Sequence, residues 1–544
     1  MNARYSRLAS GEEGVRINYL KWAQTKLPTV FLRQQLMLVG LTITSLLLLL
    51  FTTFFTSDID YDLPRNFVSS DMNFGVVVDC GSSGTRAHIF EWHQDDSKMH
   101  SIELLRDRIT QKPLNKHITP GLSSLQAEPD KASDYMEPIM NFISESIPVE
   151  RHLDTPIYFM ATAGLRLLDK SIQKKLLSDL TRDLRVKFNF PKIKSQVISG
   201  ENEGVYSWLS LNRKRIFTGE ETSNNNNDTA TKSFGMIEMG GASTQVAFEL
   251  DPEVESAIVQ DLGDSDTVEA FKREHITLNL GQNKSIKLFA STFLGLGVNS
   301  ARESAIDLLV RDYLKGTGGL GSKHEKNFEV RLQDPCLTTG SSEIVLRPTE
   351  LITSTQQSIG FVIKQQEDTF KVRLEGSGNF LNCLTLLERV LQIVKTERLN
   401  CPSSTMQQAK QTCPIVLLGN NFIPFKYQSF VGLSEMFFTT NEMVNAAGRF
   451  NRTKVLHETN RICSTEYNKL LEMYSNNGVS FEDRILYECF KSSWLLTIIH
   501  NSGFKMPTTY ENFVTAEKLD GHEIDWTIGA MLSQVALNKI LISS

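Results

Sequence analysis

The chain has 544 residues, of which 40% are hydrophobic and 22% are charged, and it contains 33 glycines and 16 prolines. This composition excludes a disordered, a collagenous and a polytopic membrane protein, and at about 150 residues per domain the length suggests three or four domain-sized units. The formal net charge of −6 gives no electrostatic reason to expect a nucleic-acid partner.

The first predicted element is a membrane-spanning helix at Leu36–Phe55, a run of 20 residues without a charged side chain. At about 1.5 Å rise per residue, this run spans roughly the 30 Å hydrocarbon core of a bilayer. Residues 1–35 carry six basic and two acidic side chains and acidic residues follow the run, so the positive-inside bias places this tail in the cytosol. A cleaved signal peptide is the alternative, but no A-x-A site follows. We expect a type II anchor and, at 57–72, a stem.

Alternating strands and helices are predicted after the stem. Phe74–Asp79 and Thr155–Ala161 are apolar runs that end in small-residue turns, as buried strands do. Helical spacing occurs at Lys131–Ser146, Ser171–Arg185 and Glu203–Arg215. This alternation indicates an α/β fold.

The second half of the chain gives a weaker pattern. Helical spacing occurs at Phe380–Thr396 and Ser464–Ser475, and the polar stretches Thr218–Lys232 and Gly316–Lys326 predict surface loops. Polar residues interrupt the final run, Trp526–Ser544, so we expect a packed amphipathic helix there and no second membrane span.

Six of the seven cysteines lie in the last 210 residues, which suits an oxidising compartment, while Cys80 stands alone. Six cysteines allow fifteen connectivities, and the sequence alone does not choose among them. We expect consecutive pairing because Cys401 and Cys413 flank a short segment, which gives Cys336–Cys383, Cys401–Cys413 and Cys463–Cys489. Three sequons, at Asn227, Asn283 and Asn451, are expected glycosylation sites on the same side of the membrane.

Two segments about 160 residues apart share one plan. Val76–Thr85 and Met236–Thr244 each read as an apolar strand, an acid, a glycine turn and then hydroxyl side chains. Glycines let backbone N–H groups approach phosphate oxygens, hydroxyls add donors, and the acid can hold a hydrated divalent cation. One such loop is more often an ordinary turn, but two copies predict a duplicated fold with phosphates between them.

Hydrolysis also needs a base that orients and deprotonates water. Val197–Trp208 passes from a strand to a helix and supplies Glu201 and Glu203. The alternative for Glu203 is a glutamate that only complements the helix dipole. No P-loop lysine signature or kinase catalytic loop occurs, which excludes those designs for phosphoryl transfer.

Five motifs, in order, carry a resemblance to a known family. They are Val78–Arg86 (VDCGSSGTR), Ala161–Arg166 (ATAGLR), Ile198–Trp208 (ISGENEGVYSW), Ile237–Gln245 (IEMGGASTQ) and, more loosely, Gly432–Phe438 (GLSEMFF). Over about residues 74–535 the chain resembles the nucleoside triphosphate diphosphohydrolase (apyrase) family, and the late cysteines are similar to that family's disulfide set. The anchor, Glu203–Asn212 and Trp526–Leu532 resemble its Golgi and lysosomal-apyrase-like branch.

The resemblance implies a fold of the actin, sugar-kinase and heat-shock-ATPase superfamily. Two ribonuclease-H-like lobes would surround a nucleotide cleft and follow the transmembrane helix. Lobe I would comprise 73–199 plus about 505–544, and lobe II would comprise 200–504.

The resemblance also assigns roles by position. Glu203 would be the catalytic base, and Ser243 and Gln245 would position the attacking water. Asp79 and Glu238 would hold Mg²⁺ or Ca²⁺ through water, with Mn²⁺ as a third candidate. The phosphate-binding set would be Ser82, Ser83, Gly84, Thr85, Thr162, Gly240, Gly241 and Ala242. Phe437 and Phe438 would stack on the base.

Three departures from the family pattern affect these roles. Glu238 stands where an aspartate is usual, so the metal geometry could differ although the charge is kept. Cys80 replaces a small residue, and we expect it to be a packed side chain and not a nucleophile. Phe437 and Phe438 replace tyrosines that are common in the family, which removes two hydroxyls. Relatives in this branch commonly have a second, C-terminal span, which we do not expect here.

The resulting hypothesis is a lumenal, metal-dependent phosphohydrolase that converts UDP, GDP and related nucleotides to monophosphates in support of protein glycosylation, from a Golgi membrane. One alternative is a nucleotide-binding module that has lost turnover because Glu238 misplaces the metal. Another is a sugar kinase, which the cysteines and the lumenal topology disfavour. The sequence does not determine the preference for UDP or GDP, or for diphosphates or triphosphates. It also does not determine the oligomeric state, or whether the protein resides in the Golgi, in the lysosome or at the cell surface.

Overall fold

The computed structural model divides the chain into two compact units, residues 1–70 and 71–544, and only the second is described below. The described residues are 72–93, 102–218, 233–263, 265–280, 285–316, 329–349, 369–397, 423–474, 482–500, 503–507, 511–535 and 541–543. The expected tail, the anchor and the stem up to residue 71 lie outside them, as do Cys401, Cys413, Asn227 and Asn283. Met72, the last residue of the expected stem, begins the first strand. Among the helices of these ranges, the structure contains none with the length and apolarity that a membrane crossing requires.

The first sheet is mixed and has the order β3-β2-β1-β5-β6, with β4 also paired to β2. Its central strand β1 (Met72–Cys80) runs parallel to β5 (Ile157–Ala161) and antiparallel to β2 (Thr85–His93). The buried, apolar interiors of β1 and β5 explain why both strands were predictable from sequence. The other strands are β3 (Glu103–Leu104), β4 (Asn115–Ile118) and β6 (Ile193–Val197).

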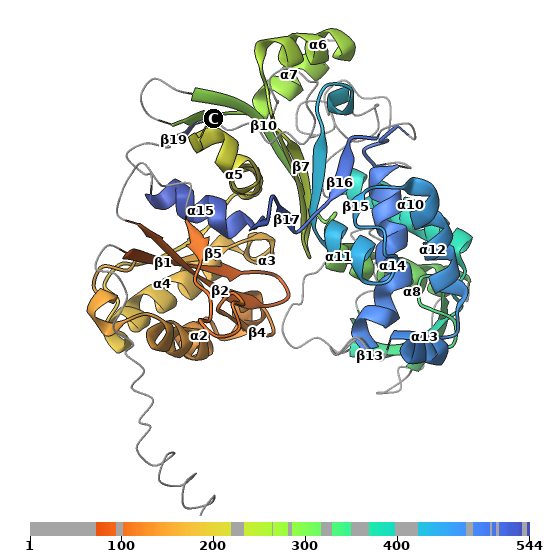
Figure 1. Cartoon of the computed structure of the whole chain (residues 1–544). Coiled ribbons are helices and arrows are strands. Elements are labelled where there is room, and N and C mark those ends of the chain that lie inside the picture. Colours follow the sequence, from red (N-terminus) through yellow and green to blue (C-terminus); the bar gives the residue numbers. More distant parts are fainter. Residues whose placement is uncertain are drawn as a thin grey trace, which may run out of the picture. The chain divides into compact units, whose positions relative to one another are not determined.

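Helices α2 (Ala132–Ser146) and α4 (Lys170–Lys187) lie side by side and pack beside this sheet, and both confirm the predicted helices (Figure 1). In α4 the residues Leu176, Leu180 and Leu184 are fully buried. Because they are spaced four residues apart, they lie on one face of the helix, and this face packs into the core. The short helix α3 (Ala163–Arg166) follows β5 directly. At the edge of the sheet where β1 and β5 end, β1 is followed by the turn Gly81–Gly84 and β5 is followed by the short helix α3.

The second sheet has the order β15-β16-β14-β7-β8-β10-β9-β19. Strand β7 runs parallel to β14 and antiparallel to β8, so this sheet is also mixed. Its strands are β7 (Gly235–Met239), β8 (Ser243–Glu249), β9 (His275–Asn279), β10 (Ser285–Leu294), β14 (Phe430–Ser434), β15 (Gly448–Arg449), β16 (Phe513–Thr515) and β19 (Leu541–Ser543).

Helices α5 (Gly200–Thr218) and α15 (Trp526–Val535) pack on each other between the two sheets (Figure 1). One core cluster joins Val77 of β1, Trp208 of α5, Met531 of α15 and Met236 of β7. Residues 526–533 are all buried, so α15 is a core helix and not the amphipathic one expected, and it ends at Val535. The two sheets are therefore parts of one continuous hydrophobic core.

The C-terminal segment does not belong to one sheet. The family resemblance placed about 505–544 with lobe I, and α15 does contact β1. Strand β16, however, pairs with β14, and β19 pairs with β9, so both strands extend the second sheet. The backbone hydrogen-bond partners of both strands lie in the second sheet. Hydrophobic periodicity along the chain does not reveal such pairings, so this division of the segment could not be predicted.

A helical layer accompanies the second sheet, with α8 (Val298–Gly316) and α10 (Phe380–Glu397) packed on α14 (Glu482–Ile499). The predicted helix Ser464–Ser475 is wrong at its start, because α12 (Arg452–Ser464) ends where it was expected to begin and α13 (Tyr467–Tyr474) follows. The remaining helices and the small hairpin are α6 (Pro252–Leu262), α7 (Ser265–Arg273), α11 (Glu435–Glu442), β17 (Lys518–Leu519) and β18 (His522–Glu523).

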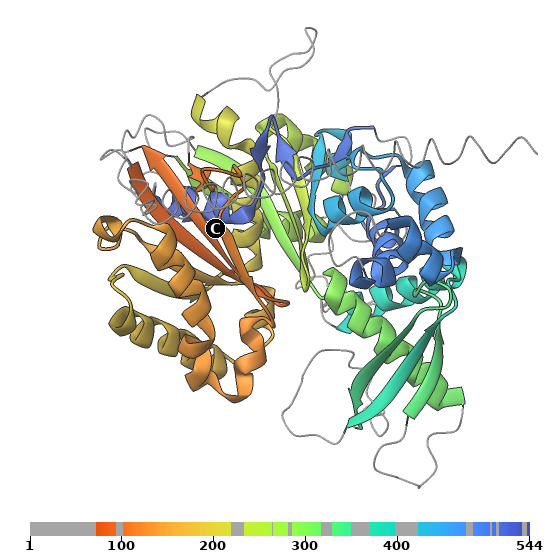
Figure 2. The same cartoon turned by 60° about the horizontal axis from the view of Figure 1, so that its bottom comes forward.

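A small sheet of β11 (Glu329–Asp334), β13 (Thr369–Gly376) and β12 (Ser342–Pro348) packs against α8 (Figure 2). Val330, Phe370 and Val372 of this sheet contact Ile306 and Val310 of the helix. This sheet lies away from the cleft described below, because none of its residues lines that cleft among the described ranges.

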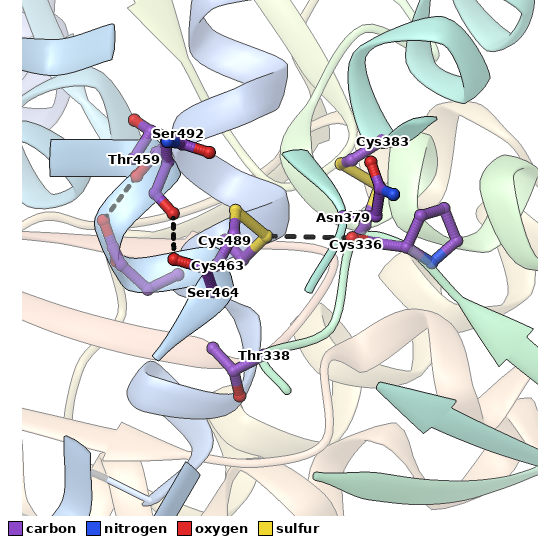
Figure 3. Close-up of a disulfide and its surroundings, with 12 residues drawn as sticks. Cys336, Thr338, Asn379, Cys383, Thr459, Cys463, Ser464, Cys489 and Ser492 are labelled. Carbon is purple, nitrogen blue, oxygen red and sulfur yellow. Dashed lines mark hydrogen bonds between the residues drawn. A yellow bond between two sulfur atoms is a disulfide. The ribbon is translucent and has the colours of Figure 1, made fainter. Parts of the chain in front are cut away.

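Two disulfides join elements of this helical part within the described residues, and both are pairs expected from the sequence. Cys336, which follows β11, is bonded to Cys383 of α10. Cys463 of α12 is bonded to Cys489 of α14 (Figure 3). Both bridges connect segments far apart in the chain to the same helical layer, and they support the expectation of an oxidising compartment.

Candidate active site

A cleft with a volume of about 400 Å³ opens between the two turns that the sequence singled out. Residues from the first sheet, from α5, from the second sheet and from the segment before α15 line it. The expected site residues that line it are Asp79, Ser82, Ser83, Gly84, Thr162, Glu203, Glu238, Gly240, Gly241, Ala242, Ser243, Phe437 and Phe438. The structure therefore brings together residues that are hundreds of positions apart in the sequence.

The first turn, Gly81–Gly84, follows Asp79 at the end of β1 and packs tightly on α3. A Cβ atom added to Gly164 of α3 would lie 2.8 Å from the Cα atom of Ser82. The Thr162 N–H donates to the Cys80 carbonyl at 3.4 Å, which holds the start of α3 against the strand. Glycine at position 164 is thus required for this close approach.

The second turn, Gly240–Ala242, connects β7 to β8 and directs its carbonyl groups toward α8. The Gly240 and Gly241 carbonyls accept from the N–H groups of Val298 and Asn299 at 3.0 and 2.8 Å. The N–H groups of Gly241 and Ala242 have no acceptor within the described residues. Successive free N–H groups in such a turn form a concave anion-binding surface.

The two turns face each other across the cleft. A Cβ atom added to Gly241 would lie 2.8 Å from Oγ of Ser82, so no larger residue fits there without movement. An anion held by one turn is therefore also within reach of donors on the other.

Glu203 lies in the first turn of α5 and is 8% exposed. Its carboxylate accepts from the Arg166 guanidinium of α3 and, at 3.3 Å, from Nε2 of Gln245. Burial raises the pKa of Glu203, and the positive charge of Arg166 opposes this rise. A buried carboxylate with a raised pKa and side-chain donors around it has the environment of a general base.

Ser243 and Gln245 stand next to Glu203 at the start of β8. Nε2 of Gln245 donates to Oγ of Ser243 at 2.6 Å as well as to Glu203, and both residues are almost fully buried. Only Ser243 of the two lines the cleft among the described residues. Gln245 therefore supports Ser243 and Glu203 from behind.

Glu238 and Asp79 are the acids that end the two matching strands. Oε1 of Glu238 accepts from the Ser434 hydroxyl at 2.8 Å and Oε2 accepts from the Ser207 hydroxyl. Burial, and then the charge of Glu203, raises the pKa of Glu238 from its ordinary 4.5 to about 8. Burial also raises the pKa of Asp79, with further contributions from Asp525 and Glu203. These carboxyls repel one another in a buried site.

A divalent cation fits this arrangement. Oδ1 of Asp79 is buried and has no hydrogen-bond partner in the part of the chain that the structure describes. In the same ranges, no three His, Cys, Asp or Glu side chains converge closely enough to bind a metal directly. The free oxygen of Asp79 and the crowding of carboxyls fit a cation, and Asp79 and Glu238 are the acids that would hold it; such a cation would offset the mutual repulsion of the carboxylates.

Phe437 and Phe438 lie on α11 at the wall formed by the second sheet. Their ring centroids are 5.7 Å apart with planes inclined at 66°, and Phe438 is 37% exposed. An exposed aromatic ring in the same cleft as the turn Gly240–Ala242 can stack on a planar ring of a ligand.

Other expected positions lie differently. Thr85 is fully buried, and its hydroxyl accepts from the Tyr135 hydroxyl at 3.2 Å. The first residue of β2 therefore points into the sheet, which corrects its expected contact with phosphate. Cys80 is a buried free thiol, as expected for a packed side chain. Asn451 is exposed and caps α12 by accepting from the Lys454 N–H at 3.0 Å.

The sequence did not predict two of the residues that surround the acids of the site. Arg166, the last residue of the motif ATAGLR, pairs with Glu203 but does not line the cleft among the described residues. Asp525 lines the cleft and caps α15 by accepting from the Thr527 N–H at 2.8 Å. An aspartate directly before an apolar helix is a recognisable cap signal, but nothing in the sequence relates Asp525 to Asp79.

A comparison with family models matches residues 66–543 to the GDA1/CD39 (nucleoside phosphatase) family. The chain belongs to this family. The resemblance drawn from the five motifs is therefore confirmed, and the protein is a hydrolase of phosphoric anhydrides.

Relatives support the same placement of this nucleoside phosphatase family member. "Ectonucleoside triphosphate diphosphohydrolase 7" of Mus musculus is 31% identical over 543 residues, covering 93% of this chain and 83% of the relative. "Nucleoside-diphosphatase mig-23" of Caenorhabditis briggsae is 28% identical over 85% of this chain and 77% of the relative.

Among solved structures, the "nucleoside triphosphate hydrolases from Neospora caninum" share the fold, with a TM-score of 0.52 and 16% identity over 86% of this chain and 93% of that one. The protein is therefore an α/β protein of the actin and sugar-kinase type. This confirms the expected fold class, whereas the expected transmembrane helix lies outside the described residues.

Proposed function

We propose that the protein is a metal-dependent phosphohydrolase that removes the terminal phosphate of nucleoside diphosphates, UDP and GDP among them, and of triphosphates. The observation that carries this proposal is the meeting of both glycine turns with Glu203, Asp79 and Glu238 in one cleft. Family membership supports a nucleotide as the substrate.

In the proposed reaction, Glu203 accepts a proton from a water molecule that attacks the terminal phosphorus. Ser243, supported by Gln245, orients that water. The bond from phosphorus to the bridging oxygen breaks, and inorganic phosphate and the shortened nucleotide leave. A bound Mg²⁺ or Ca²⁺ would neutralise phosphate charge.

The remaining residues bind and orient the substrate. The N–H groups of Gly241 and Ala242 and the hydroxyls of Ser82 and Thr162 would hold phosphate oxygens. Phe438 would stack on the base. The residues that would hold the hydrated cation are Asp79 and Glu238.

The proposed role is to clear nucleoside diphosphates that glycosyltransferases release in the Golgi lumen. The positive tail before Leu36–Phe55, the disulfides and the sequon at Asn451 support a lumenal catalytic part. Protease protection of intact microsomes tests this topology. We expect the catalytic part to be resistant until detergent is added, and digestion without detergent would contradict a lumenal position.

The activity is tested with the full-length protein in detergent. Phosphate release is measured from UDP, GDP, CDP, ADP and their triphosphates, with Mg²⁺, Ca²⁺ or EDTA. We expect activity that EDTA abolishes. Activity that survives EDTA would rule out the metal-dependent mechanism.

Glu203→Gln tests the base, and Glu201→Gln is its matched control because Glu201 lies in the same helical turn but does not line the cleft among the described residues. We expect Glu203→Gln to lose at least about 100-fold in kcat, in the range of general-base catalysis. The control should keep most of its activity. Equal losses in both variants would indicate damage to α5 and not removal of a base.

A module that binds nucleotide without turnover is the alternative, because Glu238 is one methylene longer than the usual aspartate. The hydroxyls of Ser434 and Ser207 argue against misplacement, since they fix both carboxylate oxygens. Nucleotide binding by the wild-type protein without phosphate release would favour this alternative.

A further inference from the structure

The wall of the cleft opposite Phe437 and Phe438 is a polar row across three strands. In the register of β1 and β2, Asp79 lies directly opposite Arg86. In the register of β2 and β4, Arg86 lies directly opposite His117. Directly opposed residues share one face of the sheet, and all three line the cleft. The row thus places a guanidinium between an acid and an imidazole.

Arg86 is exposed in the cleft and carries the strongest positive charge there. Among the described lining residues, Arg86 is the one Arg or Lys, whereas the acids are Asp79, Glu203, Glu238, Glu435, Glu517, Glu523 and Asp525. Arg86 has no ion pair with any described residue, in contrast to Arg166, which is paired with Glu203. An unpaired cation beside so many acids is available to a ligand.

We propose that Arg86 binds a phosphate group of the nucleotide directly and that it is a specificity-determining residue for polyphosphate. This inference rests on the proposed function. A nucleoside diphosphate brings several negative charges into an acidic cleft, and one hydrated cation does not balance them. A guanidinium offers paired N–H donors to phosphate oxygens, so it supplies charge and orientation together.

The position of Arg86 matches this role. Directly opposed residues of an antiparallel pair have Cβ atoms about 5 Å apart, so Arg86 reaches the same space as Asp79. The turn Gly81–Gly84 connects the two strands, so phosphate held by its hydroxyls would lie at the end of this row. The charge of Arg86 also favours the ionised form of Asp79. The experiment therefore separates direct phosphate binding by Arg86 from this effect on Asp79.

The test measures binding of the methylene-bridged analogue of UDP by calorimetry, with the full-length protein in detergent and Mg²⁺. We expect Arg86→Ala to weaken binding about 10- to 100-fold, as the loss of a charge-assisted hydrogen bond does. Arg86→Lys should recover part of this loss. Binding of uridine, which has no phosphate, should be unchanged, and inorganic phosphate as a second probe should weaken in the same direction as the analogue.

Lys116→Ala is the matched control, because Lys116 is an exposed cation on β4, next to His117 but on the other face of the strand. The control should bind the analogue as the wild type does. Unchanged binding by Arg86→Ala, or equal weakening by Lys116→Ala, would overturn the proposal. Recovery of Arg86→Ala at higher pH would also overturn it, since that would indicate a role through the ionisation of Asp79. A wild type that binds the analogue but releases no phosphate would refute the proposed function and leave this inference intact.

Discussion

The Ser434 hydroxyl donates a hydrogen bond of 2.8 Å to Oε1 of Glu238. Ser434 ends β14 with a positive φ of 57°, which is uncommon for a residue with a side chain, and α11 begins at the next residue. Glu435, the first residue of α11, pairs with Lys491 of α14 at 3.0 Å. One strained turn therefore fixes both the acid at the end of β7 and the helix that carries Phe437.

Shortening Glu238 should reduce activity. Glu238→Asp withdraws the carboxylate from the hydroxyls of Ser434 and Ser207, so we expect kcat to fall about tenfold and more Mg²⁺ to be needed for half-maximal rate. Ser434→Ala should act in the same direction, and the double variant should add little because the two residues form one unit. Higher activity in Glu238→Asp would instead favour the inactive-module alternative.

Removing Arg166 should move the acidic limb of the pH profile. Arg166 opposes the rise in the pKa of Glu203, so Arg166→Ala should raise that pKa further. A general base works only when it is deprotonated, so activity is lost as the pH falls through the pKa. We expect the acidic limb of kcat/KM against pH to shift to higher pH in Arg166→Ala and to return in Arg166→Lys. An unshifted limb with a uniform loss of rate would show that Arg166 acts only by packing.

Glu488 should make stability depend on pH. This residue of α14 is buried, its Oε1 accepts from Ser492 at 2.7 Å, and burial raises its pKa from 4.5 to about 8. Lys491 opposes the rise, while Glu442 and Glu435 add to it. Between about pH 5 and 8 the folded state holds a proton that the unfolded state has lost, so stability falls as the pH rises, by up to about 1.4 kcal/mol per pH unit.

Glu488→Gln keeps the shape of the side chain and cannot titrate. We expect this variant to lose that slope and to be more stable than the wild type near pH 8, as measured by denaturant unfolding at several pH values. Glu145→Gln, at an exposed position of α2, should leave the slope unchanged. If Glu488→Gln kept the same dependence of stability on pH, a group other than Glu488 would be binding the proton.

Gly529 should be required for the packing of α15 on α5. A Cβ atom added there would overlap the backbone of Tyr206. We expect Gly529→Ala to destabilise the protein by about 1–3 kcal/mol through overpacking, seen as a lower Tm. Gly316→Ala is the control, because nothing lies within 4 Å of the added atom at the end of α8. Equal Tm values for the two variants would contradict this tight contact.

Local patterns in the sequence predicted the elements that build the cleft. The strands β1 and β5, the helix α5 and both glycine turns each carry their signal within about ten consecutive residues. Glu203 was only a candidate from such a signal, and its predicted role as the base came from the family resemblance. Thr85 was assigned wrongly because a row of hydroxyls does not show where β2 begins. Successive strand residues point to opposite faces, so Thr85 points inward while Arg86 faces the cleft.

Relationships between distant segments could not be predicted. The pairing of Arg166 with Glu203, the approach of Asp525 to Asp79 and the contact between Ser434 and Glu238 depend on how separate elements pack. Each of these residues alone has an ordinary surface interpretation. The second sheet also gains β16 and β19 through backbone hydrogen bonds, for which hydrophobic spacing gives no register.

The buried position of α15, near the end of the chain, has a consequence for folding during synthesis. During translation the residues of β1 and α5 emerge long before Trp526, although Val77, Trp208 and Met531 share one core cluster. Until α15 emerges, the surface that it covers stays open and apolar, so the nascent chain presents a chaperone-binding site for most of its synthesis. A premature stop before Trp526 would make that exposure permanent and mark the product for degradation.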